Sequence, residues 1–142
     1  MDALQRVEQC SAMESQQETS ITGRSLVSVV DDDESVRESL PDLLREFGFA
    51  ANSFSSAEEF LSSNNIDETR CLVLDIAMPG MGGLELQQEL ERNGQKIPIV
   101  FMTAHKDTAV QTRALRQGAV SFLLKPFSDT ALLEAVKAAL QR

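Results

Sequence analysis

The sequence predicts an α/β domain in which one parallel sheet is covered by helices on both faces. Short apolar segments with the character of strands alternate five times with amphipathic segments whose apolar residues recur at helical spacing. Most strand segments are continuous apolar runs rather than alternations of apolar and polar residues, which is typical of strands that are buried on both faces. Parallel strands also need crossover connections, and these are usually helices. We therefore expect a doubly wound (βα)5 domain, a three-layer sandwich with a parallel five-stranded sheet in the middle.

The expected elements follow one another from Leu26 to the C-terminus. The strands are expected at Leu26–Val30, Ala50–Phe54, Cys71–Asp75, Ile97–Thr103 and Val120–Leu124. The helices are expected at Glu34–Phe47, Ala57–Ser62, Leu84–Asn93, Thr108–Gln117 and Ser128–Leu140. Most of these helices are followed by a Gly, which tolerates the left-handed backbone of a helix stop.

Two helices carry a local signal of their own. Pro41 lies inside the first helix, where a proline removes a backbone hydrogen bond, so we expect a kink there or a helix that begins later. At the start of the second helix, Ser55 with Glu58 and Ser56 with Glu59 are alternative capping boxes.

The composition is that of a soluble globular chain. The 142 residues suffice for one domain. Their net charge of −9 argues against nucleic acid or a membrane surface as partner, because those contacts depend on clustered Lys and Arg. The first residues show no basic region followed by an apolar stretch, so no secretory signal is expected, and the two cysteines suggest no disulfide framework. We therefore expect a cytoplasmic protein. Residues 1–24, rich in Gln, Glu and Ser, are expected to be a flexible arm, and residues 25–142 the folded domain.

Polar side chains stand at the carboxyl ends of the predicted strands. In open parallel sheets, ligands bind in the crevice outside these ends. The candidates are Asp31, Asp32 and Asp33 after the first strand, Asp75 at the end of the third, Thr103 at the end of the fourth and Lys125 after the fifth. If these strands are neighbours, one pocket receives carboxylates, a hydroxyl and an ammonium group.

A group of carboxylates favours a bound cation. Two carboxylates about 4 Å apart repel by roughly 4 kcal/mol at an effective dielectric of about 20, so a cluster raises its pKa values or recruits a positive charge. Oxygen ligands without His or Cys select Mg²⁺ or Mn²⁺. Such an ion beside an aspartate, with Lys and Thr opposite, can hold a phosphoryl group while a carboxylate oxygen attacks in line. Asp33 and Glu34 are expected instead to begin the first helix.

Four segments, taken together and in this order, resemble a known family. They are VVDDDESVRESL, LVLDIAMPGMGGLEL, IPIVFMTAH and GAVSFLLKPF. From Ser25 to its C-terminus, the chain is similar to the receiver domain of two-component response regulators, and especially to FixJ-like receivers. The resemblance implies a flavodoxin-like fold with strand order 2-1-3-4-5.

The resemblance also implies a role for each acid of the pocket. Asp75 is expected to be the aspartate that a histidine kinase phosphorylates. Asp31 and Asp32 would be the acidic pair that holds Mg²⁺, with Asp32 the direct ligand. The backbone carbonyl of Ala77 would complete the protein ligands.

Three further residues receive roles in the same way. Thr103 would hydrogen-bond the phosphoryl oxygens, and Lys125, followed by a cis peptide bond to Pro126, would pair with the phosphoryl group. Phe122 would be the aromatic ring that rotates as Thr103 moves, which would alter the surface of the fourth helix, fifth strand and fifth helix. The implied partners are a sensor histidine kinase or a phosphotransfer protein, a downstream protein, and a second copy of the chain through the altered surface.

Two other functions compete with a single-domain regulator. A haloacid-dehalogenase-like phosphohydrolase also uses an aspartate nucleophile with Mg²⁺, but that family has its nucleophile after the first strand in a DxDxT-like pattern, where this chain reads DDDES. The chain could also be the N-terminal regulatory domain of a DNA-binding transcription factor; a single-domain regulator is favoured because no helix-turn-helix follows the last helix. As a receiver, the chain is expected to be no enzyme beyond assisting its own phosphorylation and dephosphorylation. His105 is expected to be a solvated loop residue.

Overall fold

The structure is a computed structural model that describes residues 25–141. The predicted arm of residues 1–24 and the terminal Arg142 lie outside the described residues. Within residues 25–141, no helix combines the length and the apolar character needed to cross a bilayer.

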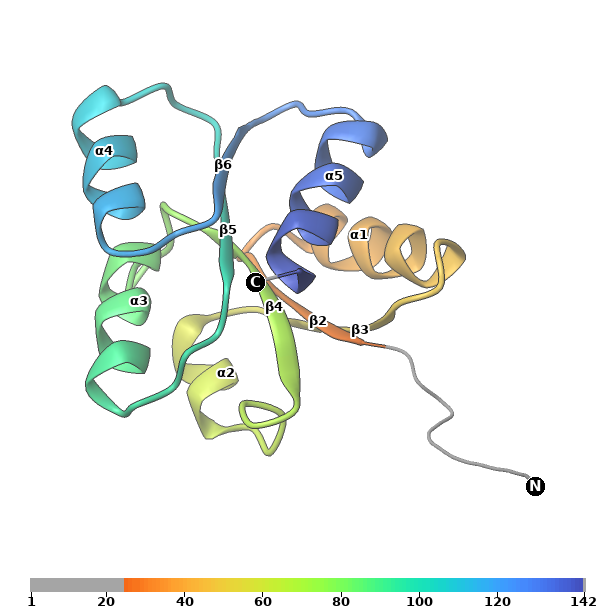
Figure 1. The fold of residues 1–142 in the computed structure, drawn as a ribbon, viewed down its shortest axis with the longest axis horizontal. Helices are drawn as coiled ribbons and strands as arrows, with labels where there is room; N and C mark the ends of the chain where they lie inside the picture. The colour runs from red at the N-terminus through yellow and green to blue at the C-terminus, as the bar shows by residue number, and fades with distance from the viewer. Residues whose placement is uncertain (1–24, 142) are drawn as a thin grey trace.

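Five parallel strands form a single sheet (Figure 1). The strands are β2 (Leu26–Val30), β3 (Ala50–Phe54), β4 (Thr69–Asp75), β5 (Ile99–Thr103) and β6 (Ser121–Leu124). Their spatial order is β3-β2-β4-β5-β6, so the predicted order 2-1-3-4-5 is confirmed. The strand expected from Ile97 begins only at Ile99, because Pro98 has no N–H to donate to a neighbouring strand.

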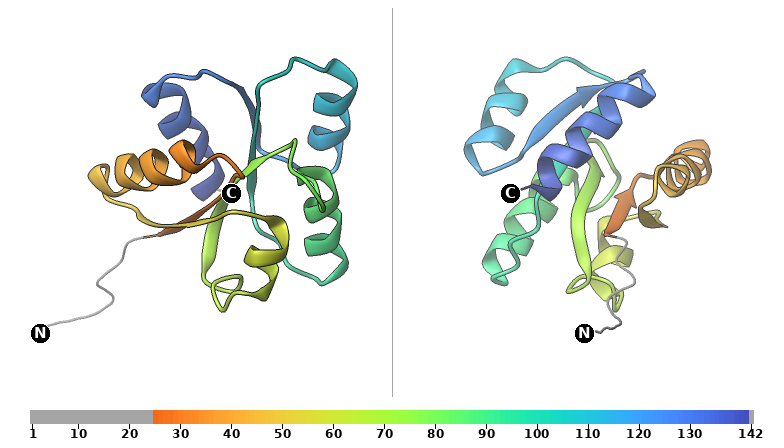
Figure 2. Two further views of the ribbon diagram at one scale, coloured as in Figure 1. Left: turned by 180° about the vertical axis from the view of Figure 1, so that it is seen from behind. Right: turned by 45° about the vertical axis from the view of Figure 1, so that its right-hand side comes forward.

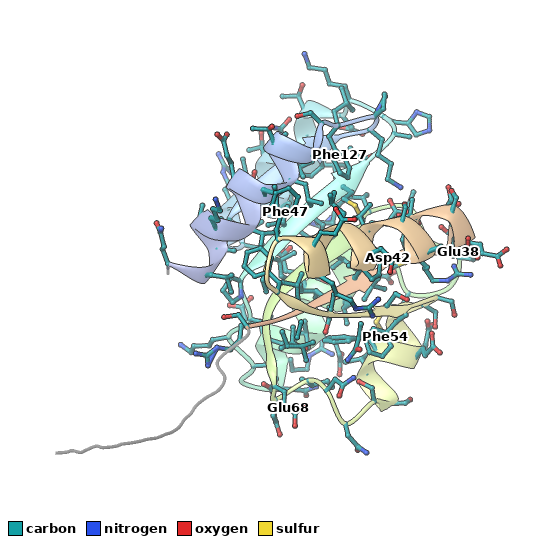
Figure 3. The ribbon with its side chains drawn as sticks, turned by 90° about the vertical axis from the view of Figure 1, so that its right-hand side faces the viewer. Glu38, Asp42, Phe47, Phe54, Glu68 and Phe127 are labelled. Atoms are coloured by element: carbon teal, nitrogen blue, oxygen red, sulfur yellow. The ribbon has the colours of Figure 1, made fainter. Side chains whose placement is uncertain are left out.

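Helices cover both faces of this sheet. They are α1 (Glu34–Glu46), α2 (Ala57–Ser62), α3 (Gly83–Arg92), α4 (Thr108–Arg116) and α5 (Asp129–Leu140). α1 and α5 lie on one face, and α2, α3 and α4 lie on the other (Figures 1 and 2). Figure 3 looks onto the face of α1 and α5, with the exposed residues Glu38 and Asp42 along α1. The predicted three-layer sandwich is therefore present.

Two apolar cores, one on each face of the sheet, hold the layers together. Successive residues of β4 contribute to the two cores in turn. Val73 belongs to the core that contains Leu44 of α1, and Leu72 belongs to the core that contains Phe60 of α2. All four side chains are fully buried. Each such burial contributes about 1.5–3 kcal/mol of stability, so the central strand is fixed from both sides.

The first helix does not begin late, which corrects one of the two expectations for Pro41. α1 starts at Glu34 and continues through Pro41 to Glu46. The start is fixed by Asp33, whose carboxylate accepts the backbone N–H of Ser35 at 2.9 Å. This N-cap, together with the burial of Pro41, offsets the backbone hydrogen bond that proline cannot make.

Of the two predicted capping boxes, the second helix shows only part of the Ser56–Glu59 box, because Glu59 accepts the N–H of Ser55 and not that of Ser56 itself. Ser56 is the N-cap of α2, and its hydroxyl accepts the N–H of Glu59 at 3.0 Å. Glu59 in turn accepts the N–H of Ser55 at 2.6 Å. Glu58 accepts no hydrogen bond from Ser55 and instead contacts the loop between β4 and α3. The Ser55–Glu58 box was therefore a wrong prediction.

Candidate functional site

β2 delivers the acid pair to the carboxyl edge of the sheet. The chain just past Val30 is held by a hydrogen bond from the N–H of Asp31 to the carbonyl of Phe54 in β3, at 3.1 Å. The side chain of Asp31 is fully buried, whereas that of Asp32 is exposed. Asp33 is the N-cap of α1, as predicted. Three consecutive aspartates thus have three different environments.

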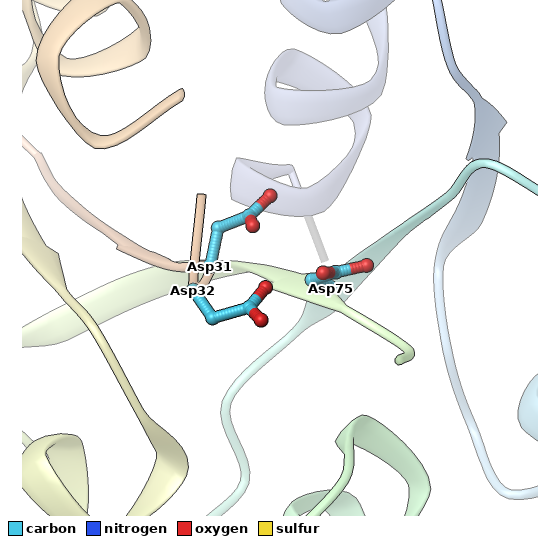
Figure 4. A group of neighbouring side chains, drawn as sticks. All are labelled: Asp31, Asp32 and Asp75. Atoms are coloured by element: carbon cyan, nitrogen blue, oxygen red, sulfur yellow. The ribbon is translucent and has the colours of Figure 1, made fainter. Parts of the chain in front are cut away.

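β4 delivers Asp75 to the same place, because it lies next to β2 in the sheet. Asp75 is the last residue of this strand and is only 6% exposed. Single carboxylate oxygens of Asp31, Asp32 and Asp75 lie within 4.8 Å of one another. Figure 4 shows the first two carboxylates at the end of β2, beside that of Asp75. The three acids therefore form one cluster, and their oxygens are the donors that a divalent metal ion prefers.

Lys125, directly after β6, brings a positive charge to this cluster. Its Nζ donates to Oδ2 of Asp31 at 2.8 Å and lies 4.0 Å from Oδ1 of Asp75. The other oxygen of Asp31, Oδ1, accepts the N–H of Asp33 at 2.9 Å. Both oxygens of Asp31 are therefore engaged. The peptide bond between Lys125 and Pro126 is cis, as predicted.

The charges of the cluster perturb one another. Burial, followed by the negative charge of Asp31, raises the pKa of Asp75 from its ordinary 3.8 to about 6. Burial disfavours the charged form of Lys125, but the hydrogen bond to Asp31 and the charge of Asp75 outweigh it and raise the pKa of the ammonium group. One ammonium group does not balance three carboxylates, so the charge of the cluster favours a further cation.

Thr103 reaches the same edge of the sheet from β5. It is buried, and it follows Met102, the residue that pairs with Asp75 in the register of β4 and β5. Its hydroxyl donates to the carbonyl of His105 and accepts the N–H of the same residue, both at 3.2 Å. In this structure the hydroxyl is therefore engaged by the loop after β5. The side chain of His105 is exposed, as expected.

Phe122 lies on β6, apart from the acid cluster. It pairs in register with Phe101 of β5, and the two ring centroids are 5.9 Å apart. Residues two positions apart on a strand face the same side of the sheet, so Phe101 and Thr103 share a face, and Phe122 lies on that face too. Phe122 is half-buried against the core beneath α3 and α4.

The loop between β4 and α3 carries Ala77, whose N–H donates to Oδ1 of Asp75 at 3.4 Å. The loop closes on itself through the N–H of Gly83, which donates to the carbonyl of Ile76 at 3.0 Å. A side chain at Gly83 would not fit, because its Cβ would lie 2.6 Å from the carbonyl oxygen of Asp75. The glycine therefore allows α3 to start directly against the end of β4.

Two residues that hold the site were not predicted from the sequence. Arg37 of α1 donates from Nη1 to the backbone carbonyl of Asp31 at 3.0 Å. Glu58 of α2 accepts the N–H of Met81, in the loop after Asp75, at 3.1 Å. An arginine on a helix face does not indicate, from sequence alone, that it will bond the backbone of Asp31. Glu58 matched a helix-capping pattern, so its contact with the loop was not anticipated.

Comparison with known proteins identifies the family. Residues 27–137 match the model of the response regulator receiver domain. The chain belongs to the response regulator receiver family. Nodulation protein W of Bradyrhizobium diazoefficiens is 48% identical to this receiver over 124 residues, which are 87% of this chain and 55% of that protein. Transcriptional regulatory protein FixJ of Azorhizobium caulinodans is 43% identical over 116 residues, 82% of this chain and 55% of that protein.

A solved structure agrees with these relatives. The crystal structure of FixJ-N matches this receiver with a TM-score of 0.76 at 38% identity, covering 84% of this chain and 96% of that one. The predicted resemblance to FixJ-like receivers is therefore confirmed, and the phosphohydrolase alternative is not supported. This receiver spans about half the length of the two curated relatives. A receiver domain implies a histidine kinase as partner.

Proposed function

We propose that this receiver accepts a phosphoryl group on Asp75 from the phosphohistidine of a sensor histidine kinase or a phosphotransfer protein. The position of Asp75 carries the proposal: it is buried at the end of the central strand, in one cluster with Asp31 and Asp32 and 4.0 Å from the ammonium group of Lys125. Burial and a neighbouring charge raise its pKa. Perturbed groups of this kind concentrate at functional sites.

Mg²⁺ is the ion that this proposal assigns to the acid cluster. Both oxygens of Asp31 already accept hydrogen bonds, whereas Asp32 is exposed, so direct coordination falls to Asp32 rather than Asp31. Asp75 and the backbone carbonyl of Ala77 are the other protein ligands. Bound Mg²⁺ would supply positive charge against the acids and the phosphoryl oxygens. Mn²⁺ suits the same oxygen donors and is the alternative ion.

The transfer step uses groups that are already close together. A carboxylate oxygen of Asp75 attacks phosphorus in line, so that an O–P bond forms while the P–N bond to the donor histidine breaks. The imidazole nitrogen that loses the phosphoryl group takes up a proton. In this structure the Nζ of Lys125 donates a hydrogen bond to Asp31 and lies 4.0 Å from Oδ1 of Asp75. After transfer, the ammonium group would donate to the phosphoryl oxygens instead.

The response of the protein to phosphorylation would begin at Thr103. Its hydroxyl would exchange its two bonds to the backbone of His105 for a phosphoryl oxygen. The half-buried ring of Phe122 faces the same side of the sheet and would turn into the space that Thr103 leaves. The surface of α4, β6 and α5 would change as a result, and would bind a downstream protein or a second copy of the chain.

Phosphorylation by a small donor tests the proposal. Incubation with acetyl phosphate and MgCl₂ should add the mass of one phosphoryl group to the intact protein, and EDTA should prevent the gain. Lys125→Ala should slow it strongly, while Glu134→Ala, which removes an exposed charge from α5, should not. A wild-type protein that gains no phosphate from acetyl phosphate or phosphoramidate at saturating MgCl₂ would refute the proposal.

A second candidate function is regulation of transcription by a longer protein that contains this receiver. The observation in its favour is that FixJ, a transcriptional regulatory protein by name, is matched over 55% of its own length. An immunoblot of the source cells with an antibody against this receiver distinguishes the two. A band well above the mass of this chain supports the longer regulator, and a band at the mass of this chain contradicts it.

A further inference from the structure

Glu58 links α2 to the loop that follows Asp75. Its Oε2 accepts the backbone N–H of Met81 at 3.1 Å, although the two residues are 23 positions apart. The chain passes very close to this carboxylate: a Cβ at Gly80 would lie 2.9 Å from Oε2, and Gly80 has a φ of +74°, which L side chains rarely adopt. The backbone conformation at Gly80 therefore allows the loop to approach the carboxylate of Glu58 closely.

The two ends of this loop are held by other contacts. At the start, the N–H of Ile76 donates to the carbonyl of Met102 in β5 at 2.9 Å. At the end, the N–H of Gly82 donates to Oε1 of Glu85 in α3 at 2.8 Å. The sheet thus fixes the start of the loop and α3 fixes its end. The stretch between them runs from Ala77 to Met81, and the contact with Glu58 holds it at Met81.

We propose that Glu58 is a positioning residue that sets the Mg²⁺ affinity of this receiver by holding the loop and, with it, the backbone carbonyl of Ala77. The inference rests on the proposed function, in which that carbonyl is a metal ligand. A backbone ligand can be oriented only by the conformation of its own loop. When the loop occupies the competent conformation for a smaller fraction of the time, the apparent dissociation constant rises in inverse proportion to that fraction.

The expected effect is moderate. Removal of a group that bonds a metal ligand directly typically weakens metal binding roughly 10- to 100-fold. Glu58 acts one step further away, on the loop rather than on the ligand, so we expect Glu58→Ala to raise the Mg²⁺ dissociation constant roughly threefold to tenfold. Phosphorylation by acetyl phosphate should then need more Mg²⁺ for half-maximal rate, while the rate at saturating Mg²⁺ stays close to that of wild type.

Three variants separate the hydrogen bond from other effects. Glu58→Ala removes the acceptor, and Glu58→Gln keeps an acceptor oxygen without the charge. Glu59→Ala is the matched control, because it removes a neighbouring carboxylate of the same helix that bonds Ser55 and not the loop. Since the sequence contains no Trp or Tyr, Mg²⁺ binding is best followed by NMR titration of the backbone amides of Asp32 and Ala77.

The inference predicts weaker Mg²⁺ binding for Glu58→Ala, recovery of most of the loss in Glu58→Gln, and a wild-type dissociation constant for Glu59→Ala. Equal losses in Glu58→Ala and Glu58→Gln would overturn it, because the charge and not the hydrogen bond would then be responsible. An unchanged Glu58→Ala would overturn it as well. Wild-type protein that binds no Mg²⁺ would instead refute the proposed metal site itself, so the two failures are distinguishable.

Discussion

The middle of the sheet and its β6 edge differ in how firmly they are packed. In β4 every residue except Arg70 is buried, and in β5 all are. In β6 no residue is fully buried, and Leu124 is 47% exposed. The adjacent helix α4 buries only Ala114 and leaves Leu115 43% exposed. The acid cluster thus stands at the ends of the well-packed strands β2 and β4. Two of the three elements proposed to respond, α4 and β6, bury few side chains, which favours local opening, whereas the third, α5, is well packed.

The largest effect should come from a core truncation in the middle of the sheet. Leu74→Ala in β4 removes a fully buried side chain and should destabilise the protein by about 2–5 kcal/mol. Leu124→Ala at the edge should cost less than about 1 kcal/mol, because half of that side chain is already in water. Urea unfolding followed by circular dichroism measures both. Similar losses for the two variants would contradict the difference in packing.

The next effect concerns the charge of Asp75 and depends on pH. Because its pKa in the folded protein is about 6, above the ordinary 3.8, the fold favours the protonated form. The contribution of Asp75 to the free energy of unfolding should therefore fall as the pH rises from 3.8 to 6, and its ionised carboxylate should cost about 1–3 kcal/mol above that range.

Asp75→Asn should remove this cost. In EDTA it should be more stable than wild type at neutral pH by about 1–3 kcal/mol, with no gain well below pH 3.8, where the wild-type side chain is protonated in both the folded and the unfolded state. Unfolding curves at the two pH values provide the measurement. A gain of equal size at both would mean that a cause other than ionisation is at work.

A smaller effect should come from Mg²⁺ itself. At a free concentration ten times its dissociation constant, the ion should stabilise the wild type by about 1.4 kcal/mol relative to EDTA. Asp32→Asn should lose most of this gain, since it removes the ligand assigned to direct coordination, whereas Leu124→Ala should keep it. The comparison needs only thermal or urea unfolding with and without MgCl₂. An undiminished gain in Asp32→Asn would place the ion elsewhere.

The smallest effect is a change in local opening. The amides of α4 should exchange their hydrogens faster than those of β4, because α4 has so few buried contacts. Beryllofluoride with Mg²⁺, which mimics a phosphoryl group, should alter exchange in α4 and β6 and leave β4 nearly unchanged. Hydrogen exchange read by mass spectrometry suffices. Identical exchange of α4 with and without beryllofluoride would remove the support for a response at this edge.

The fold was largely predictable because its signals are local. Apolar runs bounded by glycines and acids placed strands Leu26–Val30 and Ala50–Phe54 and helix Ala57–Ser62 at their observed limits. The predicted start of β5 was two residues too early, because Pro98 lacks the backbone N–H that a strand residue donates, and an apolar pattern does not report this. The strand order came from the family resemblance and not from periodicity.

The site was predictable only in part, because much of it depends on contacts between distant residues. The clustering of Asp31, Asp32 and Asp75 follows from neighbouring strand ends. By contrast, the contact between Glu58 and Met81 depends on the path of a loop, which a positive φ at Gly80 sets. A sequence pattern of a few residues cannot report such a path, and here it suggested a helix cap instead.

The most direct test of the account is to locate the phosphoryl group chemically. Borohydride reduces an aspartyl phosphate to homoserine and leaves free carboxylates unchanged, so peptide mass spectrometry after treatment with acetyl phosphate and MgCl₂ reads the modified residue. The account predicts homoserine at position 75 and none at positions 31 or 32, with no product in Asp75→Asn. Homoserine at either of the other two positions, or its persistence in Asp75→Asn, would contradict the assignment of Asp75 as the phosphoacceptor.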